Sequence, residues 1–182
     1  IFALVAEGRF QAGAGVIMDI KTGELIAMVS APEYDPAVLT EGKDRTKISS
    51  YINSESYPFL NRPLLGLYTP GSVVKPFMAL AALNEEVITP EKKILSTGSL
   101  SVPNPYVPGE VTVFRDWKAH GWTNMREAIA VSSDVYFYQV GGGFEDQPGL
   151  GISRIGEYMR YFGFSAPTGV DLQAEAAGVI PN

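Results

Sequence analysis

A turn followed by a long apolar run is the feature that most constrains how this chain can fold. Pro70-Gly71 forces a change of chain direction, and Phe77–Leu83 would be apolar on every side of a helix. Such a helix is buried rather than laid on the surface. The sequence therefore predicts a buried helix from Ser72 to about Glu86, with Lys75 in its first turn.

Ser72 and Lys75 lie on one face of that helix, because residues at i and i+3 are neighbours. A serine needs a nearby base before it can attack, so the pair predicts a nucleophile, Ser72, and its base, Lys75. Ser-x-x-Lys alone is weak evidence, since two solvated side chains give the same letters. Pro76 has no N–H to offer the Ser72 carbonyl, so we expect an irregular turn here.

The composition fits one globular domain and excludes several functions. The 182 residues are 46% hydrophobic and 19% charged, enough for a real core. A net charge of −6 lacks the basic footprint of nucleic-acid binding, so we predict no nucleic-acid partner. With no cysteine, disulfides and thiolate catalysis are excluded. Ile1–Ala6 is too short to span a membrane, and we expect the chain to be a piece of something longer.

The first part of the chain predicts a β-hairpin. Two nearly continuous apolar runs, residues 15–20 and 25–30, flank a turn at residues 21–24. Strands of this kind are typically covered on both faces by helices. A long irregular segment then runs to Gly71, with one short helix near residues 44–54.

After the apolar helix, four prolines in residues 88–121 predict loops with a short strand at residues 111–114. Three helices are then expected, over residues 124–131, 134–140 and 152–162. Asn124 and Glu127 have the spacing of a capping box for the first helix. Glycines 141–143 end the second helix, and Gly163 is the C-cap of the third.

Ser132-Ser133-Asp134 is a second candidate for chemistry, because it lies in a short break between two predicted helices. Small polar side chains in such a break can point into a cleft. The competing interpretation is that Ser133 or Asp134 only caps the following helix.

Tyr68–Pro76, with Asn61-Arg62-Pro63 before it, resembles the active-site helix of penicillin-binding proteins, in particular the class B transpeptidases. The resemblance implies an α/β fold of the penicillin-binding and serine β-lactamase-like type. Ala128–Tyr138 resembles the setting of the family's Ser-x-Asn motif, with the aspartate of the penicillin-binding protein 2 subgroup, which makes cell wall during rod elongation. It implies that Ser132 relays a proton between Lys75 and the leaving group, and that Asp134 holds a substrate amide.

Lys21-Thr22-Gly23 has the letters of the family's Lys-Thr-Gly motif, but it precedes the other motifs and suits a hairpin turn. We therefore predict that the third motif is absent and that the fold is truncated. Residues 1–182 would be a partial transpeptidase domain, with the first sheet strands in 1–32 and a linker and helical subdomain in 33–182. The resemblance implies that the strand of the third motif supplies one N–H of the oxyanion hole. Losing such a donor slows reactions about 10²–10³-fold, so this segment alone should be a poor catalyst.

The resemblance implies acyl transfer. Ser72 attacks the bond between two D-alanines of a peptidoglycan stem peptide, D-alanine leaves, and an amine of a neighbouring stem takes the acyl group. β-Lactams would acylate the same serine, and no metal or organic cofactor is implied. A wall-elongation glycosyltransferase stays open as a partner. The parent protein would act at the outer, periplasmic face of the bacterial cytoplasmic membrane, with its anchor outside this chain.

Asp116 and His120, the sole histidine, allow three interpretations. They could belong to a loop held by ordinary hydrogen bonds, to a metal site, or to a Ser-His-Asp triad. Some penicillin-binding protein 2 relatives resemble a metal site here, with cysteine in the position of Ser133. We favour the structural loop and predict no metal ligand.

Two other functions stay open beside the transpeptidase. A serine β-lactamase would share the fold and Ser72 but hydrolyse its adduct. A non-catalytic sensor domain would be acylated without turnover, or not at all if Lys75 only packs.

Overall fold

The computed structural model describes residues 1–104 and 106–181. Pro105 and Asn182 lie outside the described residues. Pro105 belongs to the predicted loop 88–121, and Asn182 is the last residue of the predicted domain 1–182. The chain divides into two compact units. Unit 1 comprises Ile1–Tyr68 and Gly169–Ala176, and unit 2 comprises Thr69–Thr168 and Ala177–Asn182. The boundary expected at residue 32 stays a prediction.

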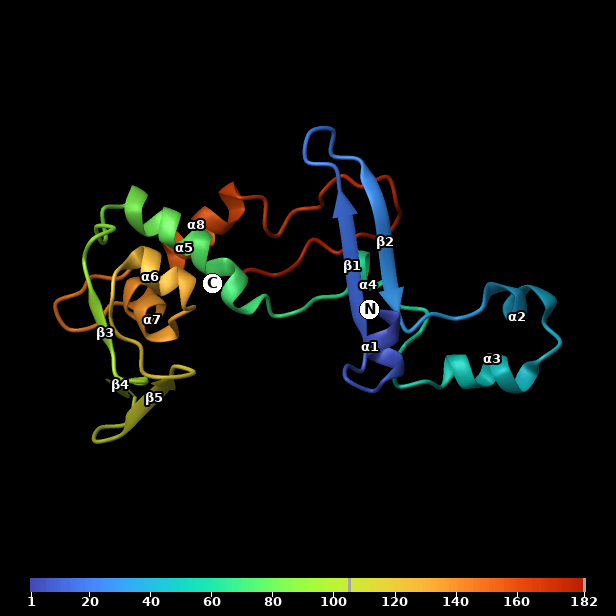
Figure 1. Ribbon diagram of the computed structural model, residues 1–182, viewed down its shortest axis with the longest axis horizontal. Helices are drawn as coiled ribbons and strands as arrows, with labels where there is room; N and C mark the ends of the chain where they lie inside the picture. Colours follow the sequence, from blue (N-terminus) through green and yellow to red (C-terminus); the bar gives the residue numbers. More distant parts are fainter. Residues whose placement is uncertain (105, 182) are drawn as a thin grey trace. The chain divides into compact units, whose positions relative to one another are not determined.

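The predicted hairpin is the centre of unit 1. Strand β1, Gly13–Met18, pairs antiparallel with β2, Leu25–Ala31, and the two lie side by side in Figure 1. Val16, Ile17 and Ile26 are nonetheless at least half exposed. The expectation that both faces are covered is therefore wrong, because no described element of unit 1 buries these side chains. Apolar side chains left exposed on two paired strands are consistent with the predicted truncation of the transpeptidase sheet.

Lys21-Thr22-Gly23 lies in the turn of this hairpin, as predicted. The Asp19 carboxylate accepts the backbone N–H groups of Lys21 at 2.7 Å and Thr22 at 3.0 Å, and these bonds lower its pKa. Gly23 has a φ of 79°, which residues with a Cβ rarely adopt. The three residues are therefore turn formers and not a strand lining a cleft.

Four helices complete unit 1: α1 Phe2–Ala6, α2 Pro36–Glu41, α3 Arg45–Ile52 and α4 Arg62–Leu65. The short helix expected near residues 44–54 is confirmed as α3, capped by the Asp44 side chain. Helix α2 lies in the segment expected to be irregular. It begins with proline in its first turn after the capping residue Asp35, a common helix start.

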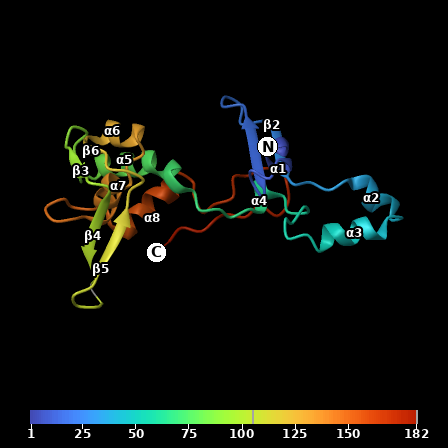
Figure 2. The ribbon, with the colours of Figure 1, turned by 60° about the horizontal axis from the view of Figure 1, so that its bottom comes forward.

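Unit 2 is a helical body with short strands at one side (Figure 2). Its elements are η1 Gly71–Val74, α5 Lys75–Asn84, β3 Ile94–Ser96, β4 Ser99–Pro103, β5 Val111–Arg115, β6 Gly121–Thr123, α6 Met125–Ala130, α7 Asp134–Gly142 and α8 Gly151–Tyr161. Helix α5 packs against α7 and α8. Ala82, Tyr136 and Val140 are fully buried in the core between them.

The predicted helices of unit 2 are confirmed. The capping box of Asn124 and Glu127 forms at the start of α6, and Gly143 caps α7. The C-cap of α8 is Phe162 and not the predicted Gly163, which follows it with a φ of 86°. Helix α5 differs in one respect, because Leu80 is 54% exposed. The helix is buried on one side only, although its sequence is apolar all round.

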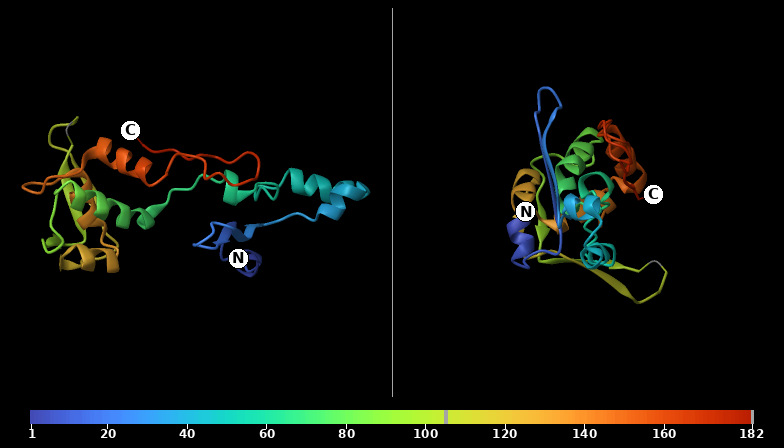
Figure 3. Two further views of the ribbon diagram at one scale, coloured as in Figure 1. Left: turned by 90° about the horizontal axis from the view of Figure 1, so that it is seen from above. Right: turned by 90° about the vertical axis from the view of Figure 1, so that its right-hand side faces the viewer.

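The strands of unit 2 were harder to anticipate. The strand expected at residues 111–114 is confirmed as β5, which pairs with β4 in a ribbon that extends away from the helices (Figures 2 and 3). Strands β3 and β6 pair with each other and were not predicted. Each of these has only three residues, too few for a recognisable alternation.

Candidate active site

Ser72 lies in the single turn η1, which leads directly into α5. The Lys75 N–H donates to the Ser72 carbonyl, closing a 3₁₀ turn in place of the α-helical bond that Pro76 cannot make. The predicted irregular turn is therefore confirmed. It leaves Ser72 exposed, while the Lys75 side chain is only 8% exposed.

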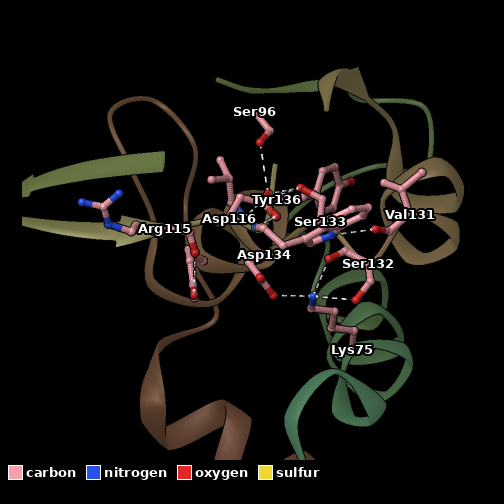
Figure 4. Close-up of polar contacts among 12 residues, drawn as sticks. Lys75, Ser96, Arg115, Asp116, Val131, Ser132, Ser133, Asp134 and Tyr136 are labelled. Carbon is pink, nitrogen blue, oxygen red and sulfur yellow. Dashed lines mark hydrogen bonds and ion pairs between the residues drawn. The ribbon is translucent and has the colours of Figure 1, made fainter. Parts of the chain in front are cut away.

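Lys75 Nζ is the centre of one of the two groups of polar contacts in Figure 4. It donates to the Ser132 carbonyl at 2.9 Å, to Ser132 Oγ at 3.1 Å and to Asp134 Oδ1 at 2.6 Å. It also lies 5.8 Å from the centre of the Phe137 ring. The structure therefore brings Lys75, Ser132 and Asp134 together from positions 57 and 59 residues apart in the chain.

The turn between α6 and α7 determines where Ser132 and Asp134 point. Ser132 has a φ of 55°, the left-handed region. Ser133 is the N-cap of α7 and accepts the Tyr136 N–H at 3.3 Å. The capping interpretation is thus confirmed for Ser133, while its two neighbours face Lys75.

A buried carboxylate supports this turn from the other side. The Asp116 side chain is fully buried, and its Oδ2 accepts Ser96 Oγ at 3.1 Å, Ser133 Oγ at 2.9 Å and the Val135 N–H at 3.0 Å. Its Oδ1 accepts the Trp117 N–H at 2.9 Å. An ionised carboxylate can accept this many bonds, so the site suits the charged form of Asp116.

The pKa of Asp116 reflects two opposing effects. Burial raises it, because the charged form loses its hydration. The backbone N–H groups of Val135 and Asp134 and the hydroxyls of Ser133 and Ser96 lower it more strongly, to about 2. Asp116 is therefore an anion at neutral pH, next to the start of α7.

Asp134 and Asp116 also act on Tyr138, one turn further along α7. Burial is the larger reason that the pKa of Tyr138 is raised, and the two carboxylates raise it further. The Tyr138 hydroxyl donates to the Arg115 carbonyl at 3.4 Å. Tyr138 therefore stays neutral and ties α7 to the end of β5.

His120 contacts Asp116 and Trp117 and is not among the described contacts of Lys75. Its Nε2 is 3.3 Å from Asp116 Oδ1 but has no hydrogen-bond partner within the described residues, and its ring packs edge-on against Trp117. Within residues 1–104 and 106–181, no three His, Cys, Asp or Glu side chains gather as metal ligands would. The contacts that the structure gives Asp116 are those of a hydrogen-bonded loop.

Sequence reasoning missed the connection from Ser96 through Asp116 to Ser133. Asp116 was considered only as a partner of His120. Ser96 lies on β3, 20 residues before Asp116, and no spacing pattern links them. One signal was available: Asp116 follows the predicted strand at 111–114 by two residues, and an aspartate at the end of a strand can accept hydrogen bonds from nearby backbone N–H groups.

Comparison with known proteins was made on both sequence and structure. The family model described as penicillin binding protein transpeptidase domain matches residues 13–182. The peptidoglycan D,D-transpeptidase MrdA of Haemophilus influenzae is 40% identical over 171 residues, which cover 93% of this chain and 25% of the relative. This chain thus spans about a quarter of the length of that relative.

Two solved structures support the same assignment. Penicillin-binding protein 2 of Helicobacter pylori, in a complex with MreC, matches with a TM-score of 0.81 and 32% identity, over 99% of this chain and 31% of the other. Penicillin-binding protein 2 of Pseudomonas aeruginosa, in complex with WCK 5153, matches with a TM-score of 0.76 and 32% identity, over 94% and 37%. The predicted α/β transpeptidase fold is confirmed. The chain belongs to the penicillin-binding protein transpeptidase domain family and is of the penicillin-binding protein 2 type.

Proposed function

We propose that the protein containing this chain is a peptidoglycan D,D-transpeptidase that works through a Ser72 acyl-enzyme. The observation that carries the proposal is the convergence of Ser132 and Asp134 on Lys75 Nζ, one turn after the exposed Ser72. Ser72 precedes the buried Lys75 by three residues, the spacing at which a nucleophile and its base can share one face of a helix. The name of the Haemophilus influenzae relative supports the substrate class.

In the proposed reaction, Ser72 Oγ attacks the carbonyl carbon of the D-alanyl-D-alanine bond of a stem peptide. The serine proton passes to Lys75 Nζ, and Ser132 relays it to the nitrogen of the leaving D-alanine as the C–N bond breaks. The amine of a neighbouring stem then attacks the ester carbonyl, the ester C–O bond breaks, a proton of that amine passes to Ser72 Oγ, and the cross-link is formed. Asp134 holds a side-chain amide of the substrate.

The contacts of Lys75 set the starting point of this sequence. An ammonium group has three N–H donors and no acceptor, and three oxygens surround Nζ. Nζ can accept the Ser72 proton only through the lone pair of its neutral amine form. Asp134 Oδ1, at 2.6 Å, is the nearest of the three oxygens.

β-Lactams would acylate Ser72 because their strained amide imitates the D-alanyl-D-alanine bond. The stem peptide and β-lactams are therefore the proposed small-molecule partners. The Helicobacter pylori structure pairs penicillin-binding protein 2 with MreC. An MreC-like protein is accordingly a candidate partner here, beside the wall-elongation glycosyltransferase.

The proposed site of action is the outer, periplasmic face of the cytoplasmic membrane. No helix in residues 1–104 or 106–181 is both long and apolar enough to cross a membrane.

The 182-residue segment contains no Lys-Thr-Gly after Asp134. We expect the segment by itself to acylate slowly, since an oxyanion donor is typically worth about 10²–10³ in rate.

Mass spectrometry of the intact full-length protein after incubation with benzylpenicillin tests the proposal. We expect a covalent adduct that persists for hours and that is abolished by Ser72→Ala. Ser101→Ala is the matched control, because this exposed serine on β4 has no side-chain hydrogen bond within the described residues.

The other outcomes identify other functions. An adduct that hydrolyses within minutes would indicate a β-lactamase. A stable adduct without cross-linking of wall precursor would indicate a sensor. Absence of any adduct on the full-length protein would contradict the assignment of Ser72.

A further inference from the structure

The loop that follows β5 holds the chain on both sides of Ser132. After Ser132, the Asp116 carboxylate accepts Ser133 Oγ at 2.9 Å and the Val135 N–H at 3.0 Å. Because Asp116 also accepts Ser96 Oγ at 3.1 Å, this anchor is tied to β3. The first turn of α7 is thereby linked through Asp116 to Ser96 (Figure 4).

Before Ser132, the next residue of the same loop provides the second contact. Trp117 Nε1 donates to the Val131 carbonyl at 3.1 Å. The indole is 62% exposed, and its other contacts, with the His120 ring and the Lys118 ammonium group, are made within the same loop. The hydrogen bond, rather than burial of the ring, is therefore the main contribution of Trp117 to this region.

Ser132 needs such support because its backbone is strained. The left-handed conformation costs a residue with a Cβ about 1 kcal/mol or more and persists only where the surroundings enforce it. Relaxation of φ from 55° to a negative value would turn the Ser132 carbonyl away from Lys75 Nζ, which it now contacts at 2.9 Å. It would also displace Ser132 Oγ, at 3.1 Å from the same nitrogen.

We propose that Asp116 and Trp117 are positioning residues for acylation of Ser72. Together they form a two-sided clamp that holds Ser132 in its left-handed conformation, so that its carbonyl and hydroxyl face Lys75. The proposal rests on the acyl-transfer function proposed above. Neither residue touches Lys75, and each acts only through the turn.

Trp117→Phe tests the clamp, because it removes the indole N–H and keeps an aromatic ring. Trp122→Phe is the matched control: Trp122 is 63% exposed and has no side-chain hydrogen bond within the described residues. In the full-length protein we expect Trp117→Phe to slow acylation by benzylpenicillin about three- to tenfold. The dissociation constant of the complex before the covalent step should stay unchanged, and Trp122→Phe should match the wild type.

A double-mutant cycle separates positioning from general support of the fold. In a Ser132→Ala background, Trp117→Phe should cause a smaller further loss of acylation rate, because the hydroxyl that it positions is gone and only the backbone carbonyl remains. A loss of the same size in both backgrounds would overturn the proposal, as would equal rates for Trp117→Phe and Trp122→Phe.

Amide hydrogen exchange gives a readout that does not depend on acylation. The Ser133 N–H donates to the Ala128 carbonyl at 2.9 Å, so loosening of the turn exposes it. Faster exchange at Ser133 in Trp117→Phe than in Trp122→Phe is expected, and equal exchange would contradict the clamp. If the wild-type protein forms no adduct, the proposed function fails, and exchange alone decides whether Trp117 holds the turn.

Discussion

At the residue scale, Lys75 places a charge where burial makes it costly. Its side chain is 8% exposed, and its ion-pair partner Asp134 is 29% exposed. Buried ion pairs often add little to stability, because desolvation offsets their attraction. The ion pair of Lys75 and Asp134 is therefore better explained by the proposed role of Lys75 as the base for Ser72 than by a contribution to the stability of the fold.

Lys75→Met should separate these two roles, because it replaces the cation by an apolar chain of similar length. We expect the free energy of unfolding to change by less than about 1 kcal/mol or to increase, since Asp134 can regain hydration. Acylation of Ser72 should be lost. Urea unfolding and the mass of the benzylpenicillin adduct measure the two effects, and a destabilisation above about 3 kcal/mol would show that the ion pair holds the fold.

Asp116 should make stability depend on acid. Its pKa is lowered to about 2 from an ordinary 3.8, so folding favours the charged form. The resulting stabilisation, about 2 kcal/mol, is fully present above pH 3.8 and is lost as pH falls through about 2. His120, which lies 3.3 Å from the carboxylate, is the titratable group facing it.

The measurement is the free energy of unfolding of the wild type and of Asp116→Asn between pH 5 and pH 2. The difference between the two proteins should shrink by most of that amount as the pH falls. A difference that stays constant would mean that folding does not lower the pKa of Asp116.

At the element scale, the junction of η1 and α5 decides where Ser72 lies. The sequence predicted an irregular turn there from Pro76 alone, and the 3₁₀ turn confirms it. It also predicted the helices that carry their own signals, such as the capping box at Asn124. It could not predict β3 and β6, because strands of three residues are formed by pairing with each other and not by local pattern.

Gly71 is the residue on which this junction depends, since its φ is 63°. Gly71→Ala should cost about 1 kcal/mol, although a Cβ would meet nothing within 4 Å, because the strain lies in the backbone. Gly142→Ala is the matched control: it lies in α7, also has open space, and should be neutral or slightly stabilising. Thermal unfolding of both variants checks this, and equal melting temperatures would contradict it.

At the scale of the whole molecule, the motifs identified the family better than they described its surfaces. The resemblance of Tyr68–Pro76 and Ala128–Tyr138 to penicillin-binding proteins predicted the transpeptidase fold, which the family model and solved structures confirm. The apolar hairpin suggested covered strands, yet Ile17 and Ile26 are 60% and 67% exposed. Apolar composition reports which side chains are suited to burial, but which element buries them depends on contacts distant in sequence.

The contact between Trp117 and the Val131 carbonyl also supplies a built-in optical reporter. The chain has two tryptophans, so Trp122→Phe leaves Trp117 as the single source of indole emission in this segment. That indole donates its N–H to the residue beside Ser132 and is 62% exposed, which makes its spectrum sensitive to local changes in solvation. The variant made as a control is thus also a sensor, able to follow the turn by fluorescence in real time without an attached dye.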